Sequence, residues 1–393
     1  MKKPKITFID NDQTLGIAYD WNKILKLYKS LDIPPEYDYS EMFPLANNNI
    51  KWYIANSGRS VGKTTNVMLI GMCMNILYGT QIQLVRHKIC KASYYENLFD
   101  TINSYGYVSK LTEGKYNTVY YHWKKFYYGR IENGKIVDKC EEPFCVSLAA
   151  EDCYSLCSTY EAPLGDWIVL DKCFNDKNTP DEFVRFLHLH KTIVRERISD
   201  KIIVLGNTLD VNNVWYRQLT IQSEVRKLKP GDSKVVYTPE GMPLHISFID
   251  NRTPTKRKTF NKLHYGFKNP EINAIVGSGE WNMKQYPQTC MLKNRELLGR
   301  GIYFNYHDDL FLEAGMLKCD SGIYFEVHPA TYSSAINGDI LYTISLATRL
   351  NELYFGEDSL SKRILKAIKE KRVVFSDNET GHLFESFLRE RGL

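Results

Sequence analysis

The sequence predicts an α/β fold built around a mostly parallel sheet, and three observations favour it. Continuous apolar runs at 167–171 and 201–205 are typical of strands buried on both faces. The segment 180–197, which lies between those two runs, has the spacing of an amphipathic helix. A Gly-Lys-Thr sequence at 62–64 joins a short apolar run to a helical one. Strands that alternate with helices in this way indicate a parallel sheet.

The clearest motif lies between Trp52 and Thr65, where a predicted strand (52–55) precedes a predicted helix (67–77). In a strand–loop–helix of this kind the loop amides surround nucleotide phosphates, the lysine reaches the β- and γ-phosphates, and the threonine hydroxyl binds magnesium. The usual pattern has glycine where Ser57 stands, but neighbouring glycines still supply the backbone freedom. The alternative is a chance Gly-Lys-Thr in a surface turn. The predicted ATP-binding loop comprises Ser57, Gly58, Arg59, Ser60, Val61, Gly62, Lys63, Thr64 and Thr65.

Composition restricts the class of protein less than the motif does. The 393 residues include 51 basic and 46 acidic side chains, a formal net charge of +5 that by itself indicates no polyanionic partner. Nine cysteines without paired Cys-x-x-Cys spacing favour free thiols in a reducing compartment. No apolar run approaches the roughly 18–20 residues that span a bilayer, and no signal peptide is evident. We therefore expect a soluble intracellular protein.

The length predicts several domains. Helical spacing from Trp21 to Leu31, stopped by Pro34-Pro35, indicates a helix in the lead-in. The predicted divisions are an N-terminal arm (1–49), a phosphate-loop ATPase domain (50–250), a basic linker (251–281) and a smaller α/β domain (282–393).

Further elements follow from apolar periodicity and turn signals. In the core we expect strands at 81–86 and 144–149, a helix at 93–102, a β-hairpin at 117–137 turning at Asn133-Gly134, and two strands within 233–249. In the last domain we expect strands at 302–305, 310–313, 322–327 and 343–346, then a helix at 359–369.

Asp171 closes the apolar strand 167–171 and is the predicted second magnesium ligand. The alternative is a strand-end aspartate that caps the next turn. In most ATPases of this type a glutamate follows and activates the attacking water. Here that residue is Lys172, which cannot act as a base while charged. Either Asp176 or Glu151 replaces it as the base, or Lys172 represents a change that holds ATP without splitting it.

Two further sets of residues are candidates for contact with the γ-phosphate. Arg195 and Arg197 end the predicted helix, and an arginine supplied by a neighbouring subunit can stabilise phosphoryl transfer. The alternative is a solvated helix C-terminus, where the helix dipole favours basic residues anyway. Asn207 follows the strand 201–205 and could sense the γ-phosphate, or it could be a turn residue.

Together, these motifs and their order resemble the DNA-packaging ATPase of small short-tailed phages, the phi-29-like relatives of terminase large subunits. The resemblance rests on Gly58-Arg59-x-x-Gly62-Lys63-Thr64, Val85-Arg86, Ile168 to Asp171, Thr192 to Arg197, and Leu205-Gly-Asn207. It is carried by residues 45–216 and continues weakly to the end. It implies an ASCE/terminase-like ATPase, with Arg59 as the loop arginine and Arg195 as the arginine acting in trans. The catalytic glutamate of the family falls on Lys172.

The resemblance also implies partners and a location. The expected protein uses ATP and Mg²⁺ to drive double-stranded DNA into a preformed procapsid. It acts as a ring, commonly a pentamer, on the portal vertex. A structural packaging RNA lies between the ring and the portal. The expected location is the host cell cytoplasm, with transient attachment to the procapsid portal. The alternatives are a nucleotide-gated DNA- or RNA-binding protein with negligible hydrolysis, and a helicase or recombination ATPase.

The family's last domain resembles a vestigial RNase H-like nuclease. The acidic residues of this domain form no recognisable two-metal cluster, which argues against nuclease activity; they are Asp308, Asp309, Asp320, Glu326 and Asp339. Basic residues suit phosphate contacts, although a solvated charged face explains them nearly as well. The candidates for nucleic-acid contact are Lys124, Lys125, Lys256, Arg257, Lys258, Lys366 and Arg372.

Overall fold

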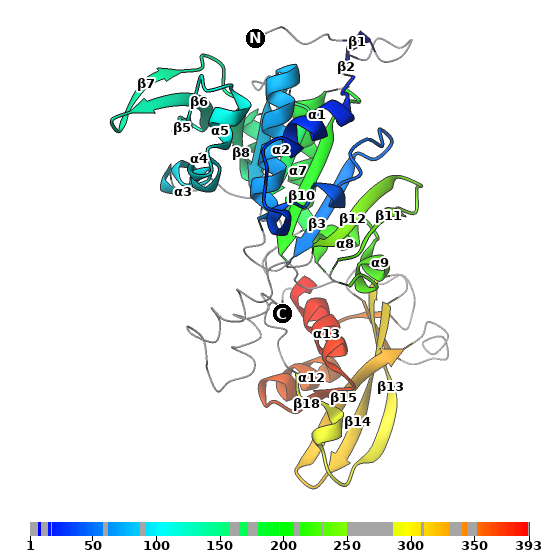
Figure 1. Cartoon of the computed structure of the whole chain (residues 1–393). Coiled ribbons are helices and arrows are strands. Elements are labelled where there is room, and N and C mark those ends of the chain that lie inside the picture. Colours follow the sequence, from blue (N-terminus) through cyan, green and yellow to red (C-terminus); the bar gives the residue numbers. More distant parts are fainter. Residues whose placement is uncertain are drawn as a thin grey trace. The chain divides into compact units, whose positions relative to one another are not determined.

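The computed structural model divides the chain into two compact units, Met1–Trp281 and Asn282–Leu393. It describes residues 7–8, 15–16, 18–57, 62–86, 92–156, 165–171, 180–195, 197–207, 213–229, 231–249, 286–307, 310–330, 340–343, 352–391 and 393. The basic linker predicted at 251–281 lies outside these residues. Figure 1 shows the elements of each unit.

The first unit is built on a ten-stranded sheet. Its parallel centre consists of β12 (Pro243–Ile249), β3 (Trp52–Ser57), β10 (Lys201–Asn207), β9 (Trp167–Asp171), β4 (Ile82–Arg86) and β8 (Cys145–Ala149), in that spatial order. The antiparallel β11 (Ser233–Tyr237) closes one side. The predicted α/β class with a mostly parallel sheet is therefore confirmed.

A three-stranded excursion closes the other side of the sheet. It consists of β5 (Thr118–His122), β6 (Lys125–Glu132) and β7 (Lys135–Lys139), and β6 pairs antiparallel with β8. Asn133 and Gly134 both have positive φ (51° and 76°), which confirms the predicted turn. The prediction missed the turn at Trp123-Lys124, because neither residue is typical of a left-handed turn (φ 48° and 63°).

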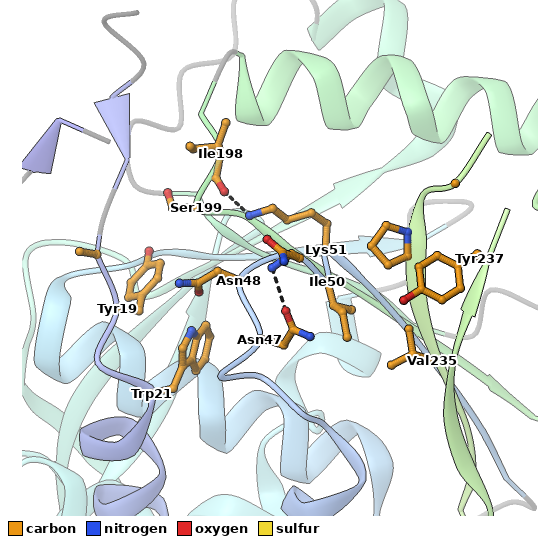
Figure 2. Close-up of a pocket in the computed structure, with 14 residues that line it drawn as sticks. Tyr19, Trp21, Asn47, Asn48, Ile50, Lys51, Ile198, Ser199, Val235 and Tyr237 are labelled. Atoms are coloured by element: carbon orange, nitrogen blue, oxygen red, sulfur yellow. Dashed lines mark hydrogen bonds between the residues drawn. The ribbon is translucent and has the colours of Figure 1, made fainter. Parts of the chain in front are cut away.

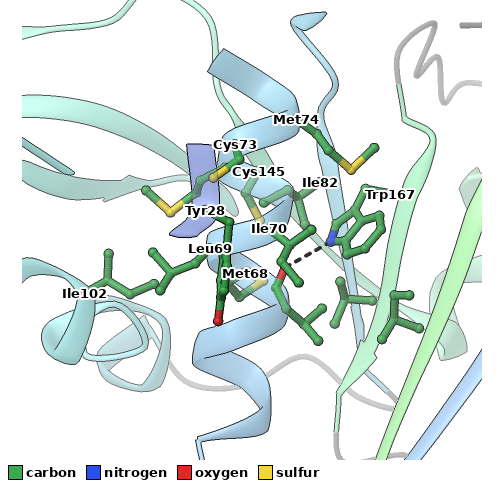
Figure 3. Close-up of a cluster of buried hydrophobic side chains, with 14 of the residues drawn as sticks. Tyr28, Met68, Leu69, Ile70, Cys73, Met74, Ile82, Ile102, Cys145 and Trp167 are labelled. Atoms are coloured by element: carbon green, nitrogen blue, oxygen red, sulfur yellow. Dashed lines mark hydrogen bonds between the residues drawn. The ribbon is translucent and has the colours of Figure 1, made fainter. Parts of the chain in front are cut away.

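Helices cover both faces of this sheet, and alternate residues of each central strand face one layer or the other. One core contains α1 (Trp21–Lys29), α2 (Lys63–Tyr78), α4 (Asp100–Ser104) and α5 (Tyr107–Leu111), and the other contains α7 (Pro180–Val194) and α8 (Val214–Gln218). Helix α2 is buried along most of its length, and the Nε1 of Trp167 on β9 donates to its Val67 carbonyl at 3.2 Å (Figure 3).

Two predicted helices differ from the observed ones. The helix expected at 93–102 is two short helices, α3 (Ala92–Glu96) and α4, separated by a turn at 97–99. The helix expected at 180–197 ends at Val194, because Arg195 adopts a left-handed conformation (φ 45°) that a helix cannot continue. The remaining described helices of this unit are α6 (Cys153–Leu156) and α9 (Gln222–Arg226).

The second unit has a six-stranded sheet in the order β17-β16-β13-β14-β15-β18. The strands are β13 (Glu296–His307), β14 (Leu310–Cys319), β15 (Gly322–Ala330), β16 (Ile340–Thr343), β17 (Glu352–Tyr354) and β18 (Val373–Phe375). β13 to β15 form an antiparallel meander, and β16 and β17 continue from β13 in parallel. Helices α12 (Ser359–Lys369) and α13 (Asn378–Glu390) share the core of this unit; α13 was not predicted.

Candidate functional site

The predicted phosphate-site residues gather at the carboxyl edge of the first unit's sheet. Ser57 ends β3, and its register partner on β10 is Asn207. On the next strand, β9, Asp171 pairs in register with Leu205 of β10. Arg86 ends β4, the strand beyond β9. Ligand sites of open parallel sheets lie outside this edge, so these residues lie where a ligand would bind.

Lys63 begins α2 directly after Gly62, whose φ of 88° is costly for any residue with a side chain. The lysine is buried, and its Nζ donates to the Ser57 hydroxyl. Burial lowers the pKa of Lys63 to about 8, while the nearby Asp171 carboxylate acts in the opposite direction. A buried ammonium beside the end of β3 is positioned to receive an anionic ligand, whose charge would favour its protonated form.

Thr64 and Asp171 meet although 107 residues separate them in sequence. The Thr64 Oγ1 donates to the Asp171 Oδ1 at 3.1 Å. Asp171 is only 4% exposed, so this pair forms in a largely dry environment. A hydroxyl and a carboxylate are hard oxygen ligands, the kind that Mg²⁺ takes while keeping several waters. This donor pair therefore fits the predicted magnesium site.

Two residues of this site had no predicted role, Arg86 and Tyr94. The Arg86 guanidinium forms a buried ion pair with the Asp171 Oδ2 and donates to the Tyr94 hydroxyl. It also lies over the Tyr94 ring, 3.8 Å from the centroid. Tyr94 in turn donates to the Asp171 Oδ2 at 3.3 Å. The sequence did offer one signal for Arg86. It ends a predicted strand, and strands of a parallel sheet end at the same edge as the phosphate loop.

Several predicted site residues lie outside the described structure. These are Gly58, Arg59, Ser60, Val61, Lys172 and Asp176, together with the side chain of Asn207. Thr65 lies on the first turn of α2, beside Thr64. Glu151 is exposed in a short 3₁₀ turn directly after β8, at the same edge of the sheet as Asp171. In the order of the sheet, β10, β9 and β4 lie between β3, which leads into the phosphate loop, and β8, which precedes Glu151.

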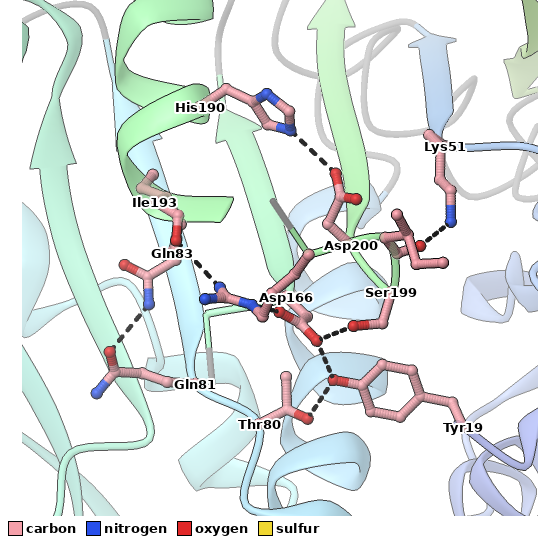
Figure 4. A network of polar contacts seen from close by, with 12 residues as sticks. Tyr19, Lys51, Thr80, Gln81, Gln83, Asp166, His190, Ile193, Ser199 and Asp200 are labelled. Carbon is pink, nitrogen blue, oxygen red and sulfur yellow. Dashed lines mark hydrogen bonds and ion pairs between the residues drawn. The ribbon is translucent and has the colours of Figure 1, made fainter. Parts of the chain in front are cut away.

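The two arginines beyond α7 lie at the opposite, amino edge of the sheet. Arg195 is exposed there, and the seven residues of β10 separate it from the carboxyl edge by roughly 20 Å. Arg197 instead contacts the buried Asp166, which is part of the polar network in Figure 4. Its Nε donates to Asp166 at 2.7 Å, and Asp166 also accepts from Tyr19 and Ser199. These contacts favour a structural role for Arg197.

A pocket of ≈ 920 Å³ also opens at the amino edge (Figure 2). It is lined by residues that precede β3 and β10, including Lys51 and Ser199, and by Tyr19, Trp21 and Tyr237. The Lys51 Nζ donates to the Ile198 carbonyl. Because it lies at the amino ends of these strands, this pocket is separate from the phosphate site.

The candidate nucleic-acid contacts are dispersed. Lys124 lies in the β5–β6 turn, 3.7 Å from Asp152, and Lys125 begins β6. The indole of Trp123 in the same turn is 83% exposed, a feature that was not predicted. In the second unit, Lys366 and Arg372 both lie near Glu370 (3.8 and 3.7 Å). Lys256, Arg257 and Lys258 lie outside the described residues.

The described carboxylates of the second unit do not gather into a metal site. Asp320 accepts from Asn294 at 2.8 Å, and Glu326 is on β15; Asp308, Asp309 and Asp339 lie outside the described residues. In the described parts of both units, no group of three or more His, Cys, Asp or Glu side chains could hold a metal ion. Within the same ranges, no helix is long and apolar enough to cross a membrane.

Comparison with solved structures identifies the fold. The chain is similar to the bacteriophage phi-29 viral genome packaging motor assembly, with a TM-score of 0.53 and 14% identity over 88% of this chain and 97% of the other. The phi-28 DNA packaging motor follows, with a TM-score of 0.48 and 16% identity over 87% and 94%. The Thermus phage P74-26 large terminase ATPase domain gives 0.37 and 14% over 65% and 96%. No family model and no curated protein matches the sequence.

Proposed function

We propose that this chain is an ATP-driven motor subunit that moves double-stranded DNA into a viral procapsid. The observation that carries the proposal is the meeting of Lys63, Thr64 and Asp171 at the carboxyl edge of the sheet. It occurs in a fold similar to that of the phi-29 packaging motor assembly. The order of motifs along the sequence supports the same conclusion.

In the proposed site, Lys63 and the loop amides of residues 57–65 bind the phosphates of ATP, and Arg59 adds positive charge. Thr64 and Asp171 hold Mg²⁺, which neutralises charge on the phosphates when bound. Asn207 is the register partner of Ser57, which supports its proposed role in reporting the nucleotide state. Arg86 positions the Asp171 carboxylate through the ion pair described above.

Arg195 acts in this proposal on the nucleotide of a neighbouring subunit. Its location at the amino edge separates it from the phosphate loop of its own chain by the length of β10, which supports a role in trans. A ring, of the pentameric kind that the resemblance implies, would bring it to the next subunit's site. Mixing Arg195→Ala and wild-type subunits should lower turnover more steeply than the fraction of variant subunits, whereas a proportional loss would contradict coupling between subunits.

The proposal also covers nucleic-acid contacts, the second unit, partners and location. DNA contact is assigned to Lys124 and Lys125 at the β5–β6 turn, and to Lys366 and Arg372 on and after α12. It is also assigned to the basic residues of the linker, Lys256, Arg257 and Lys258. The second unit is assigned as an RNase H-like domain that contacts nucleic acid without cutting it. The portal vertex of the procapsid and a structural RNA are the proposed partners, and the host cytoplasm is the proposed location.

A second candidate function follows from Lys172. A positive side chain at the position of the water-activating base favours retention of ATP over hydrolysis, which would make the protein a nucleotide-gated nucleic-acid-binding module. Steady-state ATP turnover by this chain and by a Lys172→Glu variant separates the two. Turnover by this chain supports the motor, and ATP binding without turnover in both proteins supports the binding module. Turnover in Lys172→Glu alone would show that Lys172 makes this chain hold ATP without splitting it.

A second experiment tests which nucleic-acid reaction the turnover serves. The motor requires that ATP hydrolysis be stimulated by procapsids carrying a portal, together with double-stranded DNA. Stimulation by DNA alone, with no further effect of procapsids, would instead indicate a helicase or recombination ATPase. Lys63→Ala is the control, since loss of the ammonium should abolish hydrolysis under every condition.

A further inference from the structure

Asn66 connects the N-terminal arm to the end of the phosphate loop. It lies on the first turn of α2, three residues after Lys63, and is only 3% exposed. Its amide nitrogen donates to the Gly62 carbonyl at 3.1 Å and to the Tyr37 carbonyl at 2.6 Å. Its amide oxygen accepts from the Tyr39 backbone N–H at 2.9 Å and from the Tyr28 hydroxyl.

These four bonds fix the orientation of the amide. The amide nitrogen of asparagine has two hydrogens to donate, and its oxygen has two lone pairs. Here both nitrogen partners are carbonyls, and both oxygen partners carry a hydrogen. If the amide were reversed, its oxygen would face the two carbonyls and its nitrogen would face the two donors, so none of the four hydrogen bonds could form. The side chain therefore has one favourable orientation, and three of its four partners come from the arm.

The arm is firmly attached at these points. Tyr28 on α1 is fully buried, and Tyr39 is 1% exposed. Burial raises the pKa of the Tyr28 phenol far above its usual value, so its hydroxyl remains a donor to Asn66. α1 packs against α2 in the same core, where Tyr28 lies beside side chains of α2 (Figure 3). Displacing the arm would leave a buried amide with only one of its four partners, which is costly.

On the other side, Asn66 contacts Gly62, the residue of the loop that directly precedes α2. The Gly62 carbonyl accepts both the Asn66 backbone N–H at 3.0 Å and the Asn66 side chain at 3.1 Å. Gly62 directly precedes Lys63 and has a positive φ. Holding its carbonyl from two directions limits rotation of the peptide that joins the loop to the lysine.

We propose that Asn66 is a positioning residue through which docking of the N-terminal arm and binding of the triphosphate favour each other. The inference rests on the proposed phosphate-binding function of residues 57–65. It assigns the arm a part in the nucleotide site rather than only in packing. Because coupling between two sites is reciprocal, an arm that strengthens nucleotide binding must itself be held more firmly when the nucleotide is bound.

Asn66→Ala, with Asn75→Ala as the matched control, tests the affinity half of this proposal. Asn75 is 6% exposed on the last turn of the same helix, and its side chain donates to the Thr80 carbonyl at 2.9 Å, away from the loop. Equilibrium titration with a fluorescent ATP analogue and Mg²⁺ should show affinity reduced about tenfold in Asn66→Ala and unchanged in Asn75→Ala. Tyr28→Phe, which removes one hydroxyl, should give a smaller loss and serves if Asn66→Ala does not fold.

Hydrogen exchange tests the reciprocal half, which a merely structural asparagine would not affect. In the wild-type chain the nucleotide should slow exchange of amides in residues 21–39, and it should not do so in Asn66→Ala at saturating nucleotide. The inference would be overturned if Asn66→Ala and Tyr28→Phe both bound the nucleotide as tightly as the wild type. It would also be overturned if the nucleotide left hydrogen exchange in the wild-type arm unchanged. Failure of the wild-type chain to bind the nucleotide at all would instead overturn the proposed function.

Discussion

Asp171 is the residue on which three side chains of the candidate site converge. Thr64 and Tyr94 donate to its carboxylate, and Arg86 forms a buried ion pair with it. The side chains of this ion pair are only 4% and 8% exposed, so neither charge is well solvated. In the absence of a metal, the arginine therefore supplies the positive charge that a buried carboxylate needs.

This arrangement predicts a strong energetic coupling between Asp171 and Arg86. Asp171→Asn should lower the free energy of unfolding of the nucleotide-free protein by about 3 kcal/mol, because the guanidinium loses its countercharge while buried. The double variant Arg86→Met/Asp171→Asn should lose less than the sum of the two single variants. Denaturant unfolding measures all four proteins, and strict additivity would show that the two charges do not interact.

Lys201 provides a pH-dependent prediction at the amino edge. Burial, together with the smaller effect of the Lys51 positive charge, lowers its pKa to about 7. Its Nζ donates to the carbonyls of Asn47 and Ile50, at 2.8 and 2.7 Å. The ordinary lysine pKa applies in the unfolded chain, so between about pH 7 and 10 the unfolded state binds more protons than the folded state. The contribution of Lys201 to stability therefore rises with pH in this window.

Comparison with a Lys201→Met variant measures this contribution. The difference in unfolding free energy, wild type minus variant, should increase from pH 7 to pH 9 by at most about 1.4 kcal/mol per pH unit. Lys26→Met, which removes an exposed lysine of α1, is the control for the loss of a lysine side chain. A flat profile for Lys201→Met would mean that this lysine keeps its charge in the folded protein.

At the level of elements, α2 depends on close approach to the sheet at Gly71. A methyl group there would lie 2.7 Å from the Ile82 Cδ1 and 2.7 Å from the Trp167 Cδ1, too close for real contacts. Gly71→Ala should therefore destabilise the first unit by about 1–3 kcal/mol, despite the better helix propensity of alanine. Adding Ile82→Val should restore part of that loss, as followed by thermal unfolding. A stabilised Gly71→Ala variant would show that α2 packs less closely.

The strands and helices of the core follow from local sequence, but some of their ends do not. Continuous apolar runs gave the positions of β4, β9 and β10 to within two residues. The end of α7 depends on the left-handed backbone at Arg195. Arginine is not a residue that signals this conformation, so the sequence did not predict where the helix ends. The turn at Trp123-Lys124 likewise lacks the glycine or asparagine that normally marks a hairpin, and it is held by a bond from the Ser147 N–H to the Lys124 carbonyl.

For the whole molecule, the motifs predicted Lys63, Thr64 and Asp171, because each lies next to an apolar strand or helix of recognisable type. The partners that hold these residues come from distant segments and could not be predicted. Arg86 meets Asp171 because β4 and β9 are neighbours, and Asn66 meets Tyr28 because α1 packs on α2. Strand order and helix packing are properties of the folded chain, and local sequence patterns do not encode them.

The first unit also separates two kinds of polar site. The carboxyl edge of its sheet carries the proposed phosphate and magnesium groups. The amino edge carries the pocket near Lys51 and the Asp166 network (Figures 2 and 4), and Arg195 lies there too. The proposed ring motor would use both edges, the proposed nucleotide groups at one and the exposed Arg195 at the other. The phosphate site is the claim on which this interpretation depends.

A crystal structure of the protein with a non-hydrolysable ATP analogue and Mg²⁺ tests that claim most directly. We expect the triphosphate to lie between residues 57 and 64, with Lys63 against the β- and γ-phosphates and the metal beside Thr64 and Asp171. The same crystals grown from Lys63→Ala should lack the nucleotide. An empty loop in the wild-type protein at saturating nucleotide, or a nucleotide bound elsewhere, would contradict the proposed motor function.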